Sequence, residues 1–512
     1  MRVYKKFFLK KLILISFLLI SSKIYSQDIF LEQENNSTKR DQIVAEVGNI
    51  KITSEEFIYN YEFGPAFTKR SKNSKQRHLE YMINEKLLAL AGYENGVMEK
   101  ETAKNIFNDI ESDLATEEMF QKEILPQVKI NDSEIERLIE KKQTEYQLRW
   151  LYTDDLQMLK SYVKELQVGI TFDSLFYTQL NDSVLIDDRQ LTSSLYNIYM
   201  KNPRFAQIID TLNPGRISDP IHTDDGWYII KIDNIVKNMI TNETEYNKLK
   251  SESVNAITKS KLDILSDQYV KELFIDENPI IKREVFNLLR SYIGKFILAP
   301  EKYSEWDLDK KLDVALDNLG LKRGDQYHGL TLVESKNQKV SLDEFIIWYR
   351  NREQYIKFLK NDLINFSKSL EDLVWLMVRD KLLTNKAIER GYDKSLWVQK
   401  QSDWWKDKIS YSVYKNDLAN SITLSSEEIS LIKENKKSQS EILSEELSKK
   451  ILHRILELKK KYKIKINEDL LNEIKVSSEN DNKSIELYIV KRGNLIPRPA
   501  YPSIDNDWAS WE

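Results

Sequence analysis

The sequence contains no cysteine and is poor in glycine and proline, with 13 and 10 in 512 residues. The absence of cysteine excludes disulfides, zinc sites built on thiolates and the lipid-modified cysteine of a lipoprotein. Scarce glycine and proline favour helices over the turn-rich architecture of a β-sandwich. Charged residues make up 31% of the chain and hydrophobic residues 41%, which is typical of a folded globular protein.

Acidic residues are absent from the first 27 positions, where basic residues precede an apolar run at 12–20. A basic segment followed by a short apolar one is the pattern of an export signal. A membrane-spanning helix needs about twenty apolar residues, so this shorter run favours removal near Ser26 or Gln27. We therefore predict that residues 1–27 are a cleaved signal peptide, with an uncleaved anchor as the alternative.

A second long apolar run is missing from the sequence, so we expect no permanent membrane anchor after the signal. The formal charge is −4, and it becomes −10 once the six cations of residues 1–27 are removed. Such an acidic balance disfavours nucleic acid as a partner. The length of 512 residues exceeds what one hydrophobic core organises, so we expect roughly two to four domains.

Residues 42–142 predict a helical module that opens with a short strand at 43–47. Thr53 precedes two glutamates, which is the chemistry of a helix start. Apolar residues then recur at helical spacing until Gly96, which supplies a left-handed stop. A further helix is expected to begin at 130–135.

The second half of the chain repeats this series, which indicates an internal duplication. The first leucine of a Lys-Leu-Leu motif lies nine residues before a glycine in both halves. Chance similarity between amphipathic helices is the alternative. The matching segments follow the same order: 340–345 with 52–57, 380–391 with 85–96, and 424–429 with 130–135.

The expected fold class is mainly α, with a duplicated helical chaperone module and one small α+β domain. The Pro-rich tail at 476–512 reads as extended and loosely ordered. Docking of its tryptophans into the helical modules or onto a partner is the alternative for this tail. The remaining predicted divisions are a small α+β domain at 143–238, a connecting helix at 239–285, a second helical module at 286–435, and a C-terminal helical segment at 436–475.

Residues 205–231, with an Asn-Pro-Gly turn and a closing strand, resemble the second half of a parvulin-type prolyl isomerase domain. The segments 44–57 and 130–135 are similar to the helical chaperone module of SurA-like and PpiC-like periplasmic proteins. This resemblance covers about residues 42–275, and the second helical copy extends it. It implies a parvulin-like domain at 143–238 and a role in protein folding.

The resembling family carries a histidine on the first strand and another on the last, linked to an acidic or thiol side chain. In this sequence Arg149 and Tyr228 take the histidine positions, and Asp182 is the candidate for the acidic one. Neither arginine nor tyrosine reproduces a pair of neutral imidazoles, so we expect little or no isomerase activity. Phe205, Trp227 and Tyr228 are the expected substrate contacts, with plain core packing as the alternative for Phe205 and Tyr228.

Tryptophans are concentrated in the second helical copy, where Trp404 and Trp405 are adjacent. Neighbouring residues cannot both face one narrow helix stripe, so we expect one of them to be exposed or at an interface, where an exposed aromatic patch would contribute to a client-holding surface. Ordinary interdomain packing is the alternative. His222 has no second histidine or cysteine at ligand spacing, and we predict no metal site and no cofactor.

The leading hypothesis from the sequence is a periplasmic holding chaperone with a parvulin-like domain that binds extended chains without catalysing isomerisation. Its expected partners are unfolded or extended polypeptides, with outer-membrane proteins as one candidate class. An active prolyl isomerase with a non-standard polar set is the enzyme alternative. A structural component of an envelope secretion assembly is the third hypothesis.

Overall fold

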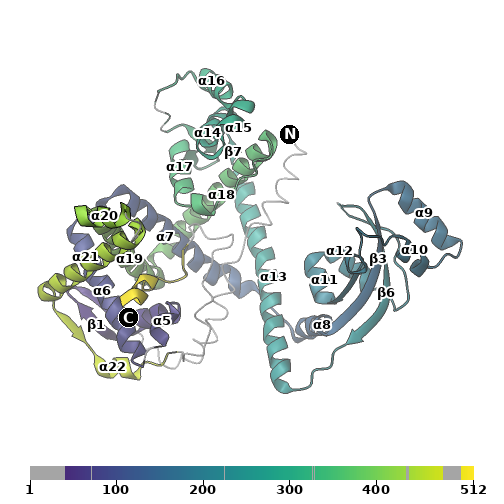
Figure 1. Ribbon diagram of the computed structural model, residues 1–512, viewed down its shortest axis with the longest axis horizontal. Helices are drawn as coiled ribbons and strands as arrows, with labels where there is room; N and C mark the ends of the chain where they lie inside the picture. The colour runs from purple at the N-terminus through teal and green to yellow at the C-terminus, as the bar shows by residue number, and fades with distance from the viewer. Residues whose placement is uncertain are drawn as a thin grey trace. The chain divides into compact units, whose positions relative to one another are not determined.

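The structure, a computed structural model, describes residues 41–511 except 71, 224, 326, 328, 434–437 and 477–497. The predicted signal peptide at 1–27 lies outside the described residues. The chain forms two compact units, and Figure 1 shows their elements. Unit 1 contains residues up to 127 and from 262 onward, whereas unit 2 contains residues 128–261.

Unit 1 begins with the predicted strand at 43–47, which forms a β-hairpin with a second strand that the sequence did not predict, and helices follow. Thr53 caps the first helix, accepting a hydrogen bond from the backbone nitrogen of Glu56 at 3.1 Å. Gly96 adopts the left-handed conformation, with φ of 64°, just after the long helix Ser74–Glu94. The elements are β1 (Ile43–Val47), β2 (Ile50–Thr53), α4 (Ser54–Glu62), α5 (Ala66–Lys69), α6 (Ser74–Glu94) and α7 (Glu101–Met119).

The second copy repeats this element order, with a 3-10 turn at Glu353–Tyr355 in the place of α5, and its α20 corresponds to the helix at Asp132–Gln143. Ser341 caps its first helix through a capping box with Glu344, and Gly391 takes the place of Gly96 with φ of 78°. The elements are β8 (Thr331–Glu334), β9 (Lys339–Ser341), α17 (Leu342–Arg350), α18 (Leu363–Glu389), α19 (Leu396–Asn420) and α20 (Ser426–Lys433).

An ion pair recurs at matching positions of the two copies. The ammonium of Lys86 on α6 lies 2.6 Å from a carboxylate oxygen of Glu56 on α4. Lys381 on α18 pairs in the same way with Glu344 on α17. Each glutamate precedes a buried phenylalanine and each lysine precedes a leucine pair. Shared helical periodicity does not account for this pair, so it supports the predicted duplication.

Each hairpin recruits a third strand from elsewhere in the chain. β10 (Ile464–Ile466) pairs antiparallel with β1, and β7 (Ile280–Ile281) pairs antiparallel with β8. The resulting orders are β10-β1-β2 and β7-β8-β9. The added strand therefore lies on the equivalent edge of both hairpins.

The long helices pack across the two copies. α6 of the first copy packs along α19 of the second, and α18 packs along α7. At the first contact the hydroxyl of Ser410 donates to the carbonyl of Ala89 at 2.8 Å. A Cβ at Gly92 would lie 2.4 Å from that hydroxyl oxygen, so the glycine permits this close approach.

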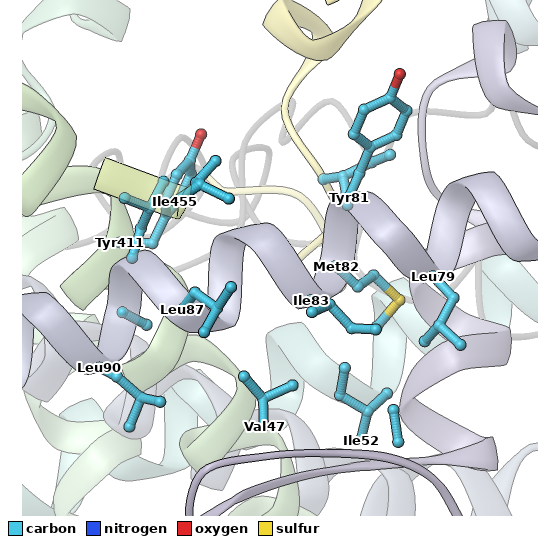
Figure 2. Close-up of a cluster of buried hydrophobic side chains, with 14 of the residues drawn as sticks. Val47, Ile52, Leu79, Tyr81, Met82, Ile83, Leu87, Leu90, Tyr411 and Ile455 are labelled. Atoms are coloured by element: carbon cyan, nitrogen blue, oxygen red, sulfur yellow. The ribbon is translucent and has the colours of Figure 1, made fainter. Parts of the chain in front are cut away.

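The C-terminal helical segment completes the core of the first copy. Figure 2 shows Leu87 and Leu90 of α6 beside Val47 of the hairpin, with Tyr411 of α19 and Ile455 of α21 (Gln439–Lys461) nearby. Helix α22 (Glu468–Glu473) also buries leucines in this core. A separate core holds α17 and α18 together with α14 (Arg283–Ile297), α15 (Pro300–Glu305) and α16 (Leu308–Leu319).

Unit 2 is the predicted small α+β domain, built on an antiparallel sheet of order β4-β3-β6-β5. Two helices cover each face of the sheet, α9 and α10 on one and α11 and α12 on the other (Figure 1). The strands are β3 (Thr144–Thr153), β4 (Gln190–Ser194), β5 (Ile221–His222) and β6 (Trp227–Lys237). The helices are α8 (Asp132–Gln143), α9 (Leu156–Gln167), α10 (Phe172–Thr178), α11 (Leu195–Lys201), α12 (Pro203–Ile209) and α13 (Glu243–Glu277).

The compact units differ from the predicted divisions in two places. Helix α8, placed by the sequence in the module at 42–142, belongs to unit 2 because it packs against α11 and the start of β3. The predicted segments 436–475 and 476–512 are not separate where they are described, since 438–476 and 498–511 belong to unit 1. Helix α13 (Glu243–Glu277) lies within the segment 239–285 that the sequence predicts as a connecting helix, and the boundary between the two units, at 261/262, falls inside it. Within the described residues, no helix combines the length and apolarity needed to cross a bilayer.

Candidate functional site

The sheet of unit 2 separates the residues that the sequence places in one polar cluster. Side chains alternate between the faces of a strand, and Tyr228 pairs in register with Tyr152 on β3. Arg149 contacts Phe176 on the α10 face, whereas Tyr228 contacts Phe205 on the α12 face. Arg149 and Tyr228 therefore do not form one site, and this part of the prediction is corrected.

Arg149 is held in an ion-pair network beside α10. Its guanidinium donates to Asp233 at 2.6 Å and to Asp173 at 2.7 Å, and it lies 4.9 Å from the ring centroid of Phe176. Lys231 donates to the same Asp173 carboxylate at 2.9 Å. The hydrogen bond from Arg149 to Asp233 raises the pKa of the guanidinium. Its Nε and Nη2 donors are committed to these two acids, so Arg149 stabilises the domain through charge-assisted hydrogen bonds.

Tyr228 belongs to a half-buried aromatic cluster on the other face. Its ring centroid lies 5.0 Å from that of Tyr152 and 5.0 Å from that of Phe205. The hydroxyl of Tyr228 donates to the carboxylate of Asp225 at 2.6 Å, and Thr223 donates to the other carboxylate oxygen. We call Tyr152, Phe205, Tyr228 and Asp225 the sheet site.

The electrostatics of the sheet site keep its tyrosine neutral and its acid charged. Burial and the hydrogen bond to Asp225 raise the pKa of the Tyr228 hydroxyl. The hydrogen bonds from Thr223 and Tyr228 lower the pKa of Asp225. This arrangement offers aromatic faces and a fixed acceptor to a bound chain, but no titrating imidazole.

Two other predicted site residues lie away from the sheet site. Asp182 is exposed in a turn, where the neighbouring Asn181 side chain accepts from the backbone nitrogens of Ser183 and Val184. Trp227 packs on the α9 and α10 face and lies 4.4 Å from the ring centroid of His222. Of the predicted substrate contacts in unit 2, the structure brings together only Phe205 and Tyr228.

Trp404 and Trp405 are both buried, with exposed fractions of 7% and 6%, so neither is exposed and both lie at packing contacts of α19. The reason is that α19 packs on two sides. Trp405 enters the contact with α7, and Trp404 joins Tyr59, Trp397 and Tyr501 in a separate aromatic cluster. Tyr501 belongs to the tail, so Trp404 contacts a segment of this chain.

Histidines form no metal centre in the part of the chain that the structure describes, where no group of three or more metal-ligating side chains is present. His222 is exposed, and His453 pairs with Glu457 on the surface of α21. His78 is fully buried between Thr68 and Asn60, at 3.0 and 2.9 Å. Burial lowers the pKa of His78 to about 3, so it is neutral at physiological pH.

Sequence reasoning missed several residues that the structure places at these sites. Tyr152 could be found from the alternation along β3, since it shares a face with Leu148 and Trp150. Asp225 lies in the tight turn before β6 and is brought to Tyr228 by only three residues of sequence. Tyr59 carries no sequence signal for its contact with Tyr501, 442 positions away.

Fold and site together define a mainly helical protein with two helical modules that begin alike and one small α+β domain. No protein family and no curated protein matches the sequence.

Three of the solved structures that resemble this chain are PrsA proteins. PrsA of Bacillus anthracis, a peptidylprolyl isomerase, has 17% identity and a TM-score of 0.19, with 41% of this chain and 71% of that chain covered. PrsA of Bacillus subtilis has 18% identity and a TM-score of 0.17, with 44% of this chain and 92% of that chain covered. The foldase protein PrsA of Streptococcus pneumoniae has 12% identity and a TM-score of 0.21, with 54% of this chain and 94% of that chain covered.

Proposed function

We propose that this protein is a holding chaperone of the periplasm, which binds unfolded polypeptides, outer-membrane proteins among them, without catalysing prolyl isomerisation. The observation that carries the proposal is the sheet site, where half-buried aromatic rings and a fixed carboxylate surround Tyr228 and none of the residues that form the site is a histidine. Aromatic side chains provide large contact area at low cost in conformational entropy, which suits the binding of varied extended chains.

Isomerisation has a barrier of about 18–20 kcal/mol, which a catalyst must lower by stabilising the twisted peptide bond. At the sheet site the Tyr228 hydroxyl already donates its hydrogen bond to Asp225, so it can donate to a substrate only by breaking that bond. The Arg149 guanidinium lies on the other face of the sheet. These two observations favour binding over catalysis.

Two assays on one purified sample test the proposal. Binding of a fluorescent, permanently unfolded polypeptide is expected to saturate, and Phe205→Ala is expected to weaken it several-fold. Tyr177→Ala, which removes an aromatic ring of 59% exposure from the α10 face, is the matched control and should leave binding unchanged. A protease-coupled proline-peptide assay is expected to show no acceleration.

Other results would support the alternative functions. Acceleration of the proline peptide that disappears in Tyr228→Phe would establish an active isomerase instead. Co-purification of one stoichiometric envelope partner, together with no binding of unfolded chains, would favour a structural component of a secretion assembly. Recovery of the mature chain in the cytoplasmic fraction would contradict the periplasmic location.

A further inference from the structure

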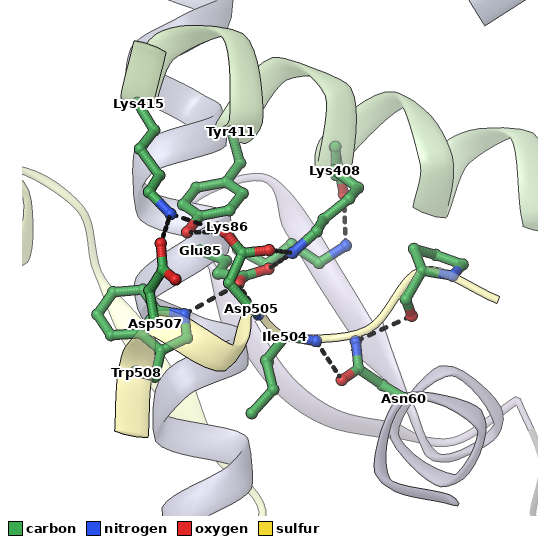
Figure 3. Close-up of polar contacts among 12 residues, drawn as sticks. Asn60, Glu85, Lys86, Lys408, Tyr411, Lys415, Ile504, Asp505, Asp507 and Trp508 are labelled. Carbon is green, nitrogen blue, oxygen red and sulfur yellow. Dashed lines mark hydrogen bonds and ion pairs between the residues drawn. The ribbon is translucent and has the colours of Figure 1, made fainter. Parts of the chain in front are cut away.

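Residues 498–511 lie on a defined surface of unit 1. We call this surface the tail site; it is formed by α4, α6, α7 and α19, and Figure 3 shows its polar contacts. Tyr501, Ile504 and Trp508 are each no more than 3% exposed. The docked tail therefore departs from the loosely ordered segment that the sequence predicts, and agrees with the alternative in which a tail tryptophan docks on the helical modules.

The tail site binds the backbone of the tail through side chains. Asn60 donates to the carbonyl of Pro502 at 3.3 Å and accepts from the nitrogen of Ile504 at 3.1 Å (Figure 3). A carboxylate oxygen of Glu85 accepts from the nitrogen of Asp505 at 2.8 Å. The buried, neutral His78 also contacts the amide oxygen of Asn60, which fixes the orientation of that amide. Side chains that satisfy single backbone groups of an extended segment are a mode of peptide recognition.

Aromatic contacts define two anchor positions of the tail. The ring centroid of Tyr501 lies 4.2 Å from that of Tyr59 and 4.7 Å from that of Phe63. Trp508 stacks on Tyr81 at 5.4 Å, and its indole nitrogen donates to Glu85 at 2.9 Å. Deeply buried aromatic anchors of this kind carry most of the energy in protein interfaces.

Opposite charges mark the two ends of the docked segment. Arg498 lies 2.8 Å from Asp113 and 3.6 Å from Glu117, both on α7. Asp505 lies 2.7 Å from Lys408 and 2.9 Å from Lys415, both on α19. Such complementarity fixes the direction and register in which a chain binds.

The second helical copy shows that the fold does not require an added segment here. Asp380 occupies the position of Glu85, one residue before the Lys-Leu-Leu motif. The carboxylate of Asp380 accepts a hydrogen bond from the indole nitrogen of Trp348 on α17, at 3.2 Å. Trp348 occupies the position that Asn60 has in the first copy. In the second copy a tryptophan of α17 thus binds this acid, whereas in the first copy a tryptophan of the tail binds it.

The contact between tail and helices also contains a cavity of about 20 Å³, between Pro502 and the polar side chains of Glu56, Lys86 and Asp407. One carboxylate oxygen of Glu56 is buried without a hydrogen-bond partner beside it. A polar cavity of this size has room for a single water molecule.

We propose that the tail site binds extended polypeptide segments in which a proline-flanked tyrosine lies between an amino-terminal cation and a carboxyl-terminal acid, and that residues 498–511 are its resident occupant. The inference rests on the proposed function only for the natural ligand, which is then an unfolded client segment of this chemistry. Because the tail is tethered, a client must compete with its high effective concentration. A client therefore occupies the tail site only when its affinity or concentration is high enough to displace the tethered tail.

The probe for this proposal is a labelled synthetic peptide of residues 498–511, measured by fluorescence anisotropy. A chain that ends at residue 497 is expected to bind it at one site, and the full chain about tenfold or more weakly, because the tethered tail competes. The peptide with Tyr501→Ala is the control and should bind neither chain. Equal affinity for both chains, or no binding to a folded truncated chain, would overturn the proposal.

A full-length variant serves if the truncated chain does not fold. Tyr501→Ala with Asp505→Lys removes one anchor and places a cation opposite Lys408 and Lys415, so the labelled wild-type peptide is expected to bind this variant as tightly as proposed for the truncated chain. Failure to bind overturns the proposal. If unfolded chains bind equally well with and without the tail, the tail-site proposal fails and the chaperone function stands. If the peptide binds and unfolded chains do not, the tail-site proposal stands and the chaperone function fails.

Discussion

Glu85 and Trp508 are joined by a hydrogen bond of 2.9 Å from the indole nitrogen to a carboxylate oxygen, although 423 positions separate them. Burial raises the pKa of Glu85, and Lys408 lies 2.8 Å from its other oxygen. The end of the chain is thereby part of the first helical copy. This contact links the stability of unit 1 to occupation of the tail site.

Lys86→Met is expected to destabilise unit 1 strongly. The substitution leaves Glu56 buried without its cation, and removing one partner of a buried ion pair costs about 3–5 kcal/mol. Lys381→Met is the matched control, because the equivalent pair in the second copy is 25% and 44% exposed and is expected to contribute about 1 kcal/mol or less. Urea unfolding of the two variants checks this, and equal losses would contradict it.

Gly92→Ala is expected to force α6 and α19 apart. The added Cβ would lie 2.4 Å from the hydroxyl oxygen and 2.7 Å from the carbonyl oxygen of Ser410, and a backbone atom cannot move away cheaply. We expect a loss of about 1–3 kcal/mol in the free energy of unfolding. Gly294→Ala, whose Cβ would meet the flexible end of Leu308, should change stability less. A neutral Gly92→Ala would contradict the close helix contact.

Acidification is expected to destabilise the protein through His78. Its pKa is about 3 in the folded chain and about 6.5 when unfolded, so between these values only the unfolded chain binds the proton. Stability from this residue is present above pH 6.5 and is lost as the pH falls. The free energy of unfolding should drop by about 2 kcal/mol between pH 7 and pH 5 relative to His78→Gln.

Urea titrations at both pH values measure this difference. His222→Gln, at an exposed histidine of unit 2, is the control and should keep the pH dependence of the wild type. A wild type and a His78→Gln variant with the same pH dependence would show that His78 is not held neutral in the folded chain.

Arg149→His is expected to create no isomerase activity, even though it restores a histidine at the predicted first-strand position. The new imidazole would face α10, on the side of the sheet away from Tyr228. Loss of the hydrogen bonds to Asp173 and Asp233 should lower stability by about 1–3 kcal/mol. Trp150→His, on the face of Tyr228, is the comparison. Acceleration by Arg149→His in the protease-coupled assay would contradict the assignment of faces.

Local patterns predicted the repeated modules well. The cap at Thr53, the left-handed Gly96 and their counterparts at Ser341 and Gly391 depend on neighbouring residues, so the sequence shows them directly. The face of a strand residue also follows from local alternation. Arg149 and Tyr228 were expected in one polar cluster because both take histidine positions of the resembling family, but the register of β3 and β6 puts their side chains on opposite faces of the sheet.

Long-range packing was outside the reach of the sequence. Trp404 and Trp405 read as a partly exposed pair because a lone amphipathic helix has one buried stripe, whereas α19 packs on both α6 and α7. The tail reads as loose because its prolines and charges lack periodicity. Its order comes from contacts of Tyr501 and Asp505 with residues about 90 to 440 positions away.

The most direct test of the proposed function is aggregation of an unfolded client. A urea-unfolded outer-membrane β-barrel protein is diluted into buffer without ATP, and light scattering is followed with and without the mature chain at equal molar concentration. We predict that the mature chain suppresses scattering and that Phe205→Ala suppresses it less. Unchanged scattering in the presence of a folded, monodisperse wild-type chain would contradict the proposed function.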